Sequence, residues 1–156
     1  MAGPGAPAVG SVEARGLRLG IVVARWHAEL TEQLLARALA AAAACAVTDV
    51  TVIRVAGSVE IPVLAQALTR RCDAVVALGL VVRGETAHFE HVCRSVTDGL
   101  TRVALDAGVP VAHGVLTVDS LDQARARAGL SGSPEDKGWD ATVAALDAAL
   151  TLARLD

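Results

Sequence analysis

The chain has 156 residues but no tyrosine, one phenylalanine and two tryptophans, and its formal net charge is -3. This scarcity of aromatic rings and of excess positive charge disfavours nucleic-acid binding, which usually needs stacking platforms and a basic surface. Also missing is the run of about 18 apolar residues that a membrane-spanning helix needs, so we expect no membrane association. The first ten residues are rich in Ala, Gly and Pro without a cationic segment, so we expect no signal peptide and a cytoplasmic location.

Cysteine is scarce as well, since Cys45, Cys72 and Cys93 lie far apart and form no C-x-x-C pair. This spacing indicates neither a disulfide framework nor a zinc ribbon, and the three thiols are expected to be reduced core residues. The glycine-rich turns G-x-x-x-x-G-K-[ST] and G-x-G-x-x-G are absent too, which disfavours nucleotide-loop enzymes. With these classes disfavoured, the length and a hydrophobic residue content of 53% predict one globular domain of ordinary size.

Short β-branched runs alternate with longer Ala- and Leu-rich runs, which predicts an α/β domain with a parallel sheet covered by helices on both faces. The four expected strands cover residues 17–24, 50–56, 73–80 and 109–116. The expected helices cover residues 28–47, 62–71, 87–107 and 120–128, before a last helix with Val143, Leu146 and Leu150. Gly108 followed by Pro110 predicts the end of the third helix. Residues 1–16 are expected to form a flexible arm, and residues 17–156 the single domain.

Unusual polar residues follow three of the expected strands. The first strand leads into residues 25–27 (RWH), the second into residues 57–60 (GSVE) and the third into residues 83–88 (RGETAH). Because ligands of open parallel sheets bind beyond the carboxyl ends of the strands, we expect these segments to face one cleft.

The third segment carries the most specific chemistry. Gly84 allows a tight turn and Thr86 is expected to cap the next helix, whose first backbone N–H groups can bind an anion. His88 in the first helical turn can exchange protons beside that anion near neutral pH. Spacing alone leaves open that this segment merely ends a strand and starts a helix. A metal site on its histidines and glutamates is disfavoured, because the H-E-x-x-H pattern and a third marked ligand are missing.

Other polar residues allow two interpretations each. Glu60 either complements a helix dipole or accepts hydrogen bonds from ligand hydroxyls. Trp26 either stacks on a flat heterocycle or packs locally. Arg127 and Lys137 flank a polar loop, where they either hold a phosphate or are solvated at helix ends.

Several short motifs stand in the order and spacing of one known family: Gly57-Ser58-Val59-Glu60-Ile61-Pro62, Ala77-Leu78-Gly79, Arg83-Gly84-Glu85-Thr86-Ala87-His88-Phe89, Gly114-Val115-Leu116-Thr117, Arg127-Ala128-Gly129 and Asp136-Lys137-Gly138. Together they strongly resemble lumazine synthase, over about residues 17–153. The resemblance implies a flavodoxin-like three-layer α/β sandwich with a four-stranded parallel sheet flanked by helices on both faces.

The implied activity is that of a transferase in the penultimate step of riboflavin biosynthesis. It joins 5-amino-6-(D-ribitylamino)uracil to 3,4-dihydroxy-2-butanone 4-phosphate, releasing phosphate and water, and forms 6,7-dimethyl-8-ribityllumazine. Amine attack on the ketone gives a Schiff base, phosphate leaves, and ring closure completes the heterocycle. The resemblance implies neither a metal nor an organic cofactor.

The resemblance also implies the role of individual residues. His88 is the implied proton-transfer residue. The pyrimidine substrate is expected to contact Trp26, Ser58, Val59, Glu60, Leu80, Val81, Val82 and His113. The butanone phosphate is expected to contact the backbone at Glu85 and Thr86, with Arg127 as a bidentate clamp and Lys137 as added positive charge.

Assembly follows from the same resemblance. It implies a homopentamer with active sites between subunits, so that His113 and Arg127 reach a neighbour's cleft, and a functional link to riboflavin synthase. Some family members assemble further into icosahedral shells. The loop at residues 130–136 is longer than the connection typical of shell-formers and includes Pro134, which favours a free pentamer.

The sequence departs from the family at several rings. Many relatives carry Phe, Asn and Phe where Trp26, His27 and His113 stand, and a small residue where Trp139 stands. The two histidines predict a ligand affinity that falls in mild acid. Three other hypotheses stay open: a non-catalytic lumazine- or riboflavin-binding scaffold of this fold, a riboflavin synthase paralogue, and a flavodoxin-like receiver module, which would need an acidic cluster where residues 25–27 stand.

Overall fold

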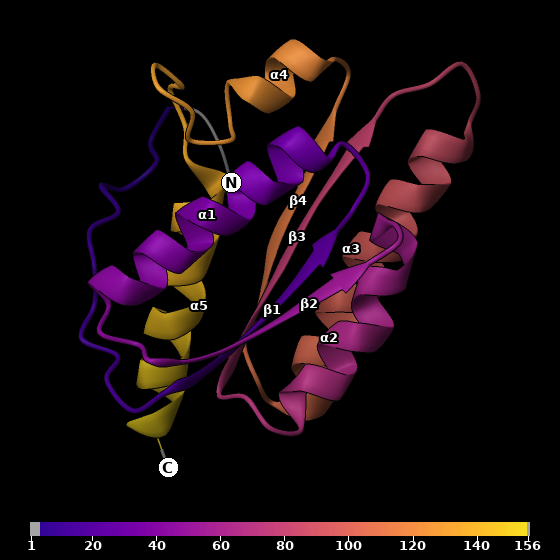
Figure 1. Cartoon of the computed structure of the whole chain (residues 1–156). Helices are drawn as coiled ribbons and strands as arrows, with labels where there is room; N and C mark the ends of the chain where they lie inside the picture. The colour runs from indigo at the N-terminus through magenta and orange to yellow at the C-terminus, as the bar shows by residue number, and fades with distance from the viewer. Residues whose placement is uncertain (1–3, 156) are drawn as a thin grey trace.

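The structure, a computed structural model, describes residues 4–155. In chain order its elements are β1 (Arg18–Ala24), α1 (Ala28–Ala44), β2 (Asp49–Val55), the 3₁₀ turn η1 (Ser58–Glu60), α2 (Ile61–Thr69), β3 (Ala74–Val82), α3 (His88–Ala107), β4 (Val111–Val118), α4 (Leu121–Arg125) and α5 (Lys137–Ala153). The strands form one parallel sheet in the order β2-β1-β3-β4. α1 and α5 cover one face of this sheet, and α2 and α3 cover the other (Figure 1). The expected three-layer α/β architecture is confirmed.

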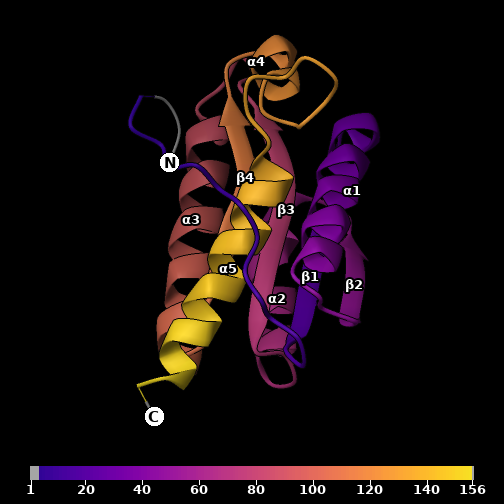
Figure 2. The ribbon, with the colours of Figure 1, turned by 90° about the vertical axis from the view of Figure 1, so that its left-hand side faces the viewer.

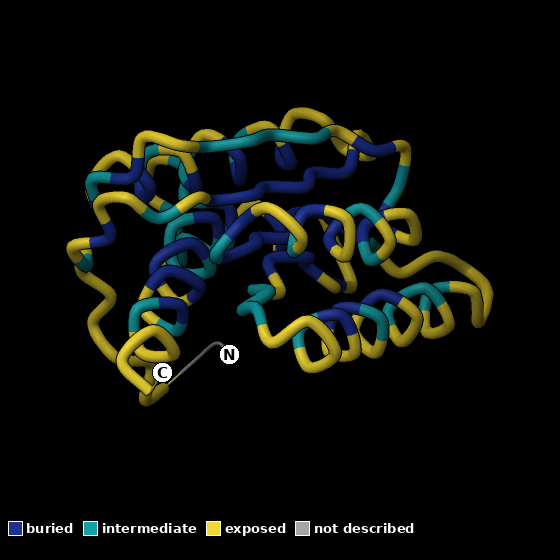
Figure 3. The backbone as a smooth tube through the Cα atoms, turned by 90° about the horizontal axis from the view of Figure 1, so that it is seen from below, coloured by how far each residue is buried: buried dark blue, intermediate teal, exposed yellow. Residues whose placement is uncertain are grey.

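The two inner strands explain why the sequence showed near-continuous apolar runs. After its first residue every position of β1 is buried, and so are the first seven positions of β3. Successive side chains of a strand point to opposite faces, and helices cover both faces here, so alternation with polar residues is lost. Leu19 and Ile21 pack on the α1/α5 side, whereas Val22 and Val75 pack on the α2/α3 side. Figure 3 shows this buried centre surrounded by the exposed outer sides of the helices.

Element ends differ from the expected ones by a few residues, for local reasons. α1 ends at Ala44 because Ala46 adopts a left-handed backbone with φ of 60°. β4 begins at Val111, because the amide of Val109 still bonds to Ala104 O at 3.3 Å at the end of α3. The predicted stop at Gly108 is confirmed, since this residue caps α3 with φ of 63°.

Residues 4–16 form an extended arm without helix or strand, which crosses α5 on its way to β1 (Figure 2). Its last part is anchored at the end of α1: Val12 N donates to Cys45 Sγ at 3.4 Å and Ala14 N to Cys45 O at 2.9 Å. Ala14 is fully buried in the core of the α1/α5 side. Within residues 4–155, no helix combines the length and the apolar character needed to cross a membrane.

Candidate functional site

A cavity of about 330 Å³, here called the first cavity, lies beyond the carboxyl ends of β1, β2 and β3 and beside the first turns of α3. It is lined by Trp26, His27, Gly57, Ser58, Val59, Glu60, Leu80, Val81, Val82, His88 and Val92. Seven of the eight residues expected at the pyrimidine substrate are among them, together with His88. The three strand ends therefore do face one cleft.

Trp26 presents an open aromatic surface to the first cavity. The residue is 67% exposed, and the neighbouring Gly57 has no side chain to cover it, since a Cβ there would lie 3.5 Å from Trp26 Cδ1. His27 starts α1 in a left-handed conformation with φ of 56°, and its ring is tilted by 55° against the indole. The indole is thus placed to stack on a flat ligand rather than to fill the core.

Ser58 and Glu60 supply the polar groups of the turn after β2. Ser58 is buried, and among the described residues its Oγ has no hydrogen-bond partner. Gly79 on β3 makes room for this hydroxyl, because a Cβ at position 79 would lie 2.8 Å from it. Glu60 Oε2 accepts a hydrogen bond from Gly57 N at 2.9 Å, which fixes the carboxylate at the mouth of the cavity. An unpartnered buried hydroxyl calls for a ligand or water.

The start of α3 differs from the expectation in one detail. Thr86 is not the cap residue: α3 begins at His88, and Ala87, already helical with φ of -62°, occupies the cap position. Thr86 Oγ1 accepts a hydrogen bond from His88 N at 3.3 Å, so the hydroxyl still satisfies one of the first helical N–H groups, from one residue further back. His88 itself is exposed at the first cavity.

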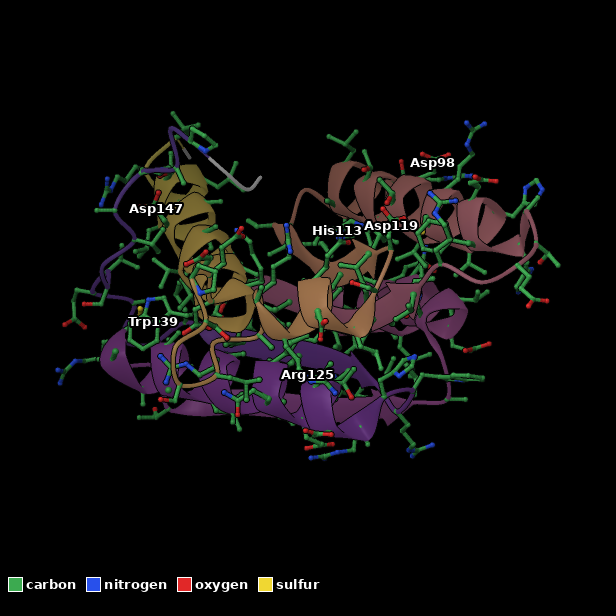
Figure 4. The ribbon with its side chains drawn as sticks, turned by 90° about the horizontal axis from the view of Figure 1, so that it is seen from above. Asp98, His113, Asp119, Arg125, Trp139 and Asp147 are labelled. Carbon is green, nitrogen blue, oxygen red and sulfur yellow. The ribbon has the colours of Figure 1, made fainter. Side chains whose placement is uncertain are left out.

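Arg83 fixes the segment between β3 and α3. Its guanidinium donates to Asp119 at 2.7 Å and to Glu90 at 3.1 Å, and lies 4.4 Å above the Phe89 ring. The hydrogen bond to Asp119, followed by the one to Glu90, raises the pKa of Arg83. These contacts join the end of β4, where Figure 4 labels Asp119, to the first turn of α3, which carries His88.

A second cavity of about 280 Å³ lies along β4 and the loop between α4 and α5. It is lined by His113, Gly114, Val115, Leu116, Thr117, Val118, Arg127 and Lys137. His113 Nε2 lies 2.9 Å from Thr97 Oγ1 of α3, and partial desolvation lowers the pKa of His113 although the residue stays exposed. Arg127 donates to Gln123 O at 2.8 Å, and Lys137 Nζ pairs with Glu135 at 2.8 Å. Figure 4 places His113 between α3 and α5.

The two cavities share no lining residue. The segment at residues 84–87 and the loop at residues 126–136 lie at opposite sides of the upper edge of the molecule, in both Figure 1 and Figure 4. Within one chain, the structure therefore does not bring Glu85 and Thr86 together with Arg127 and Lys137.

Of the residues that line the first cavity, only Val92 lies outside the segments expected from sequence, and it contacts the cavity from α3. Val92 stands four residues before the buried Val96, so its spacing was that of a core stripe, and only its place one turn from the helix start distinguished it. Among residues 4–155, no three His, Cys, Asp or Glu side chains gather to ligate a metal ion.

Comparison with known proteins gives one consistent answer. A family model described as 6,7-dimethyl-8-ribityllumazine synthase matches residues 16–153, which include both cavities. A relative of that name from Salinispora arenicola is 68% identical over 152 residues, covering 97% of this chain and 92% of the relative. One from Thermobifida fusca is 61% identical over 155 residues, covering 99% and 91%. One from Frankia casuarinae is 57% identical over 157 residues, covering 100% and 98%.

Proposed function

The chain belongs to the 6,7-dimethyl-8-ribityllumazine synthase family, and we propose that it condenses 5-amino-6-(D-ribitylamino)uracil with 3,4-dihydroxy-2-butanone 4-phosphate. The product is 6,7-dimethyl-8-ribityllumazine, with release of phosphate and water. The observation that carries this proposal is the first cavity, where an open indole, a buried hydroxyl, a carboxylate and an exposed imidazole face the same space.

The first cavity suits the ribitylaminouracil. Trp26 stacks on the pyrimidine ring, and the end of β3 at Leu80, Val81 and Val82 flanks its edge. The turn at Ser58 and Glu60 holds the ribityl chain: the unpartnered Ser58 hydroxyl meets one sugar hydroxyl, and Glu60 accepts from others. Val59, half exposed on the same turn, packs against the chain.

The phosphate of the second substrate needs groups from both cavities. The backbone at Glu85 and Thr86 precedes a helix of 20 residues, whose dipole favours an anion there. Arg127 and Lys137 add the positive charge, and His113 packs beside the heterocycle. These groups lie apart within one chain, which supports a homopentamer whose second cavity completes the first cavity of a neighbour. The extended loop at residues 130–136 favours a pentamer free of further assembly.

His88 moves the protons of the reaction. The amine of the pyrimidine attacks the ketone, water leaves as the Schiff base forms, phosphate is eliminated, and ring closure follows with loss of a second water. His88 stands at the first cavity beside the expected phosphate site, so it can assist each proton transfer, worth about 10² to 10⁴-fold in rate. Holding the two substrates in the reacting orientation lowers the activation free energy more, by up to about 7 to 11 kcal/mol. A lone subunit, which lacks the neighbour's clamp, is therefore expected to be inactive.

The free cysteines support a location in a reducing compartment. Cys45, Cys72 and Cys93 are free thiols, the first two buried, as is usual for a protein of the cytoplasm. The product is the substrate of riboflavin synthase, so we include a functional link to that enzyme in the proposal.

The test mixes purified protein with both substrates and follows lumazine absorbance together with phosphate release. Both are expected to appear together, well above the uncatalysed background. If neither rises while the protein still binds lumazine or riboflavin, the chain is a binding scaffold of the same fold, and the proposal is wrong. Product formation from lumazine alone would instead indicate a riboflavin synthase.

A further inference from the structure

The loop that carries Arg127 and Lys137 is fastened to α1 by two side chains four residues apart. Gln33 Nε2 donates to Gly129 O at 2.9 Å, and Arg37 Nε donates to Asp136 Oδ2 at 2.6 Å. Residues four apart share one helix face, so both side chains reach the same loop, on either side of its turn. We call this pair, Gln33 and Arg37, the α1 clasp.

Asp136 connects the α1 clasp to the two cationic residues. Its Oδ1 accepts a hydrogen bond from Trp139 N at 3.2 Å and so caps the start of α5, whose first residue is Lys137. It also lies against Gly129, where a Cβ would come within 2.5 Å of its carboxyl group. Lys137 N in turn donates to Arg127 O at 2.9 Å. The position of the Asp136 side chain thus sets where Arg127 and Lys137 stand.

Trp139 and the arm hold Arg37 in place from the other side. The guanidinium of Arg37 lies 5.2 Å from the centre of the Trp139 ring, and the indole Nε1 donates to Gly10 O of the arm at 3.1 Å. Figure 4 labels Trp139 where α1, α5 and the arm meet. The Arg37 and Asp136 side chains are 34% and 25% exposed, so water and salt weaken their ion pair less than a fully exposed one.

We propose that Arg37 is a positioning residue for the phosphate-bearing substrate. It lines neither cavity, and it acts through Asp136 by holding the loop in the one arrangement that presents Arg127 and Lys137 together. Trp139 supports this role by confining the guanidinium. The inference rests on the proposed function, which assigns Arg127 and Lys137 to the phosphate.

The decisive variant is Arg37→Met, which keeps much of the side-chain length and removes the charge and the hydrogen bond. It is expected to raise KM for the butanone phosphate, and the inhibition constant of inorganic phosphate, by roughly tenfold. KM for the pyrimidine and kcat should stay within about twofold, because the first cavity is untouched.

Arg54→Met is the matched control. Arg54 also pairs with a carboxylate of α1, donating to Glu32 at 2.8 and 3.0 Å, but it contacts neither the loop nor a cavity. Because its ion pair is more exposed, it should lower stability by no more than Arg37→Met does, and it should leave both KM values unchanged. A rise in KM for the butanone phosphate in Arg54→Met equal to that in Arg37→Met would overturn the proposal.

The variant Asp136→Asn tests the same ion pair in case Arg37→Met does not fold. Asparagine can still cap α5, but the ion pair with Arg37 is lost. The same selective rise in KM for the phosphate substrate is expected. Unchanged KM in both folded variants, or an equal rise for both substrates, contradicts the positioning role.

Failure of the proposed function is visible separately, as absence of lumazine formation by the unmodified protein. In that case calorimetry with inorganic phosphate decides: about tenfold weaker binding in Arg37→Met supports the inference, and equal binding overturns it.

Discussion

The two cavities of this chain are built by opposite means. The first is shaped by backbone: three strand ends and a 3₁₀ turn place its groups, and its key hydroxyl, on Ser58, is buried without a partner. The second is lined by β4 and by two cations that already have partners: Lys137 pairs with two carboxylates, and Arg127 donates to Gln123 O. Figure 1 shows the ends of β1, β2 and β3, beyond which the first cavity lies, and the loop between α4 and α5 above α1 and α5.

This difference indicates what each cavity is selected to do. A wall made of sheet ends holds its shape without ligand, as recognition of a rigid heterocycle requires. A loop held by ion pairs responds to salt and to the loss of one carboxylate. Substitutions in the first cavity should therefore change catalysis or packing, whereas those around the second should change affinity for the phosphate.

The largest effect is expected from His88→Ala. Turnover should fall by about 10² to 10⁴-fold without being abolished, since positioning of the two substrates remains. Lumazine formation under saturating substrates measures this. His91→Ala is the control, because His91 is exposed on the same helix and lines neither cavity. Complete loss of activity with normal substrate binding would contradict the division of labour between His88 and positioning.

Arg127→Ala should come next, acting on affinity and not on chemistry. Loss of charge-assisted hydrogen bonds is expected to raise KM for the butanone phosphate by about 10 to 100-fold, with KM for the pyrimidine little changed. Steady-state kinetics with each substrate varied in turn gives the answer. Arg125→Ala, which removes an exposed pair with Asp122 on α4, should behave as the unmodified protein. An effect on both substrates alike would show that the cavities are not separate in function.

Gly79→Ala tests the backbone-built cavity. The new Cβ would lie 2.8 Å from Ser58 Oγ and 3.1 Å from Ile61 Cδ1, so we expect a loss of stability of about 1 to 3 kcal/mol and weaker pyrimidine binding. Denaturant unfolding measures the first effect, and KM the second. Combining it with Ser58→Gly should restore part of the stability. If Gly79→Ala is as stable as the unmodified protein, the close packing described at Ser58 is wrong.

The smallest effect concerns pH and His113. Partial desolvation on β4 lowers the pKa of His113 below its usual value of 6.5, so in acid the unfolded chain takes up the proton first. This contribution to stability is therefore fully present above about pH 6.5 and falls as the pH drops toward the lowered pKa. The free energy of unfolding from pH 8 to 5.5 should slope more in the unmodified protein than in His113→Phe. Parallel curves would exclude this titration as a source of acid sensitivity.

The strands and the lining of the first cavity were predictable from sequence, and the reason is local. Buried parallel strands leave continuous apolar runs, and Gly57 through Glu60 form a compact motif directly after the edge strand β2. By contrast, the bonds from Gln33 to Gly129 and from Arg37 to Asp136 join residues 96 and 99 positions apart. The hydrophobic periodicity of a sequence carries no information on such long-range side-chain contacts. The same holds for Trp139, whose partner in the arm is 129 positions away.

The cap of α3 shows a finer limit of prediction. Thr86 has the side chain that a cap needs, yet Ala87 takes the position, because the Thr86 hydroxyl reaches His88 N from one residue earlier. Residue preference identifies the group that bonds, but not the residue at which the backbone turns helical. The separation of the candidate site into two cavities was likewise invisible in the sequence, since it depends on where the fold places the loop at residues 126–136 relative to the start of α3.

The strand order also carries a consequence for synthesis on the ribosome. β1 lies inside the sheet but is made first, and it pairs with β2 across a short crossover, Arg18 opposite Asp49. Its other neighbour is β3, with Leu19 opposite Ala74, so a nascent chain that ends before β3 exposes one whole edge of its most apolar strand. Such an edge pairs readily with other chains. We therefore expect this protein to aggregate most readily when translation stalls after α1 and before β3 is made.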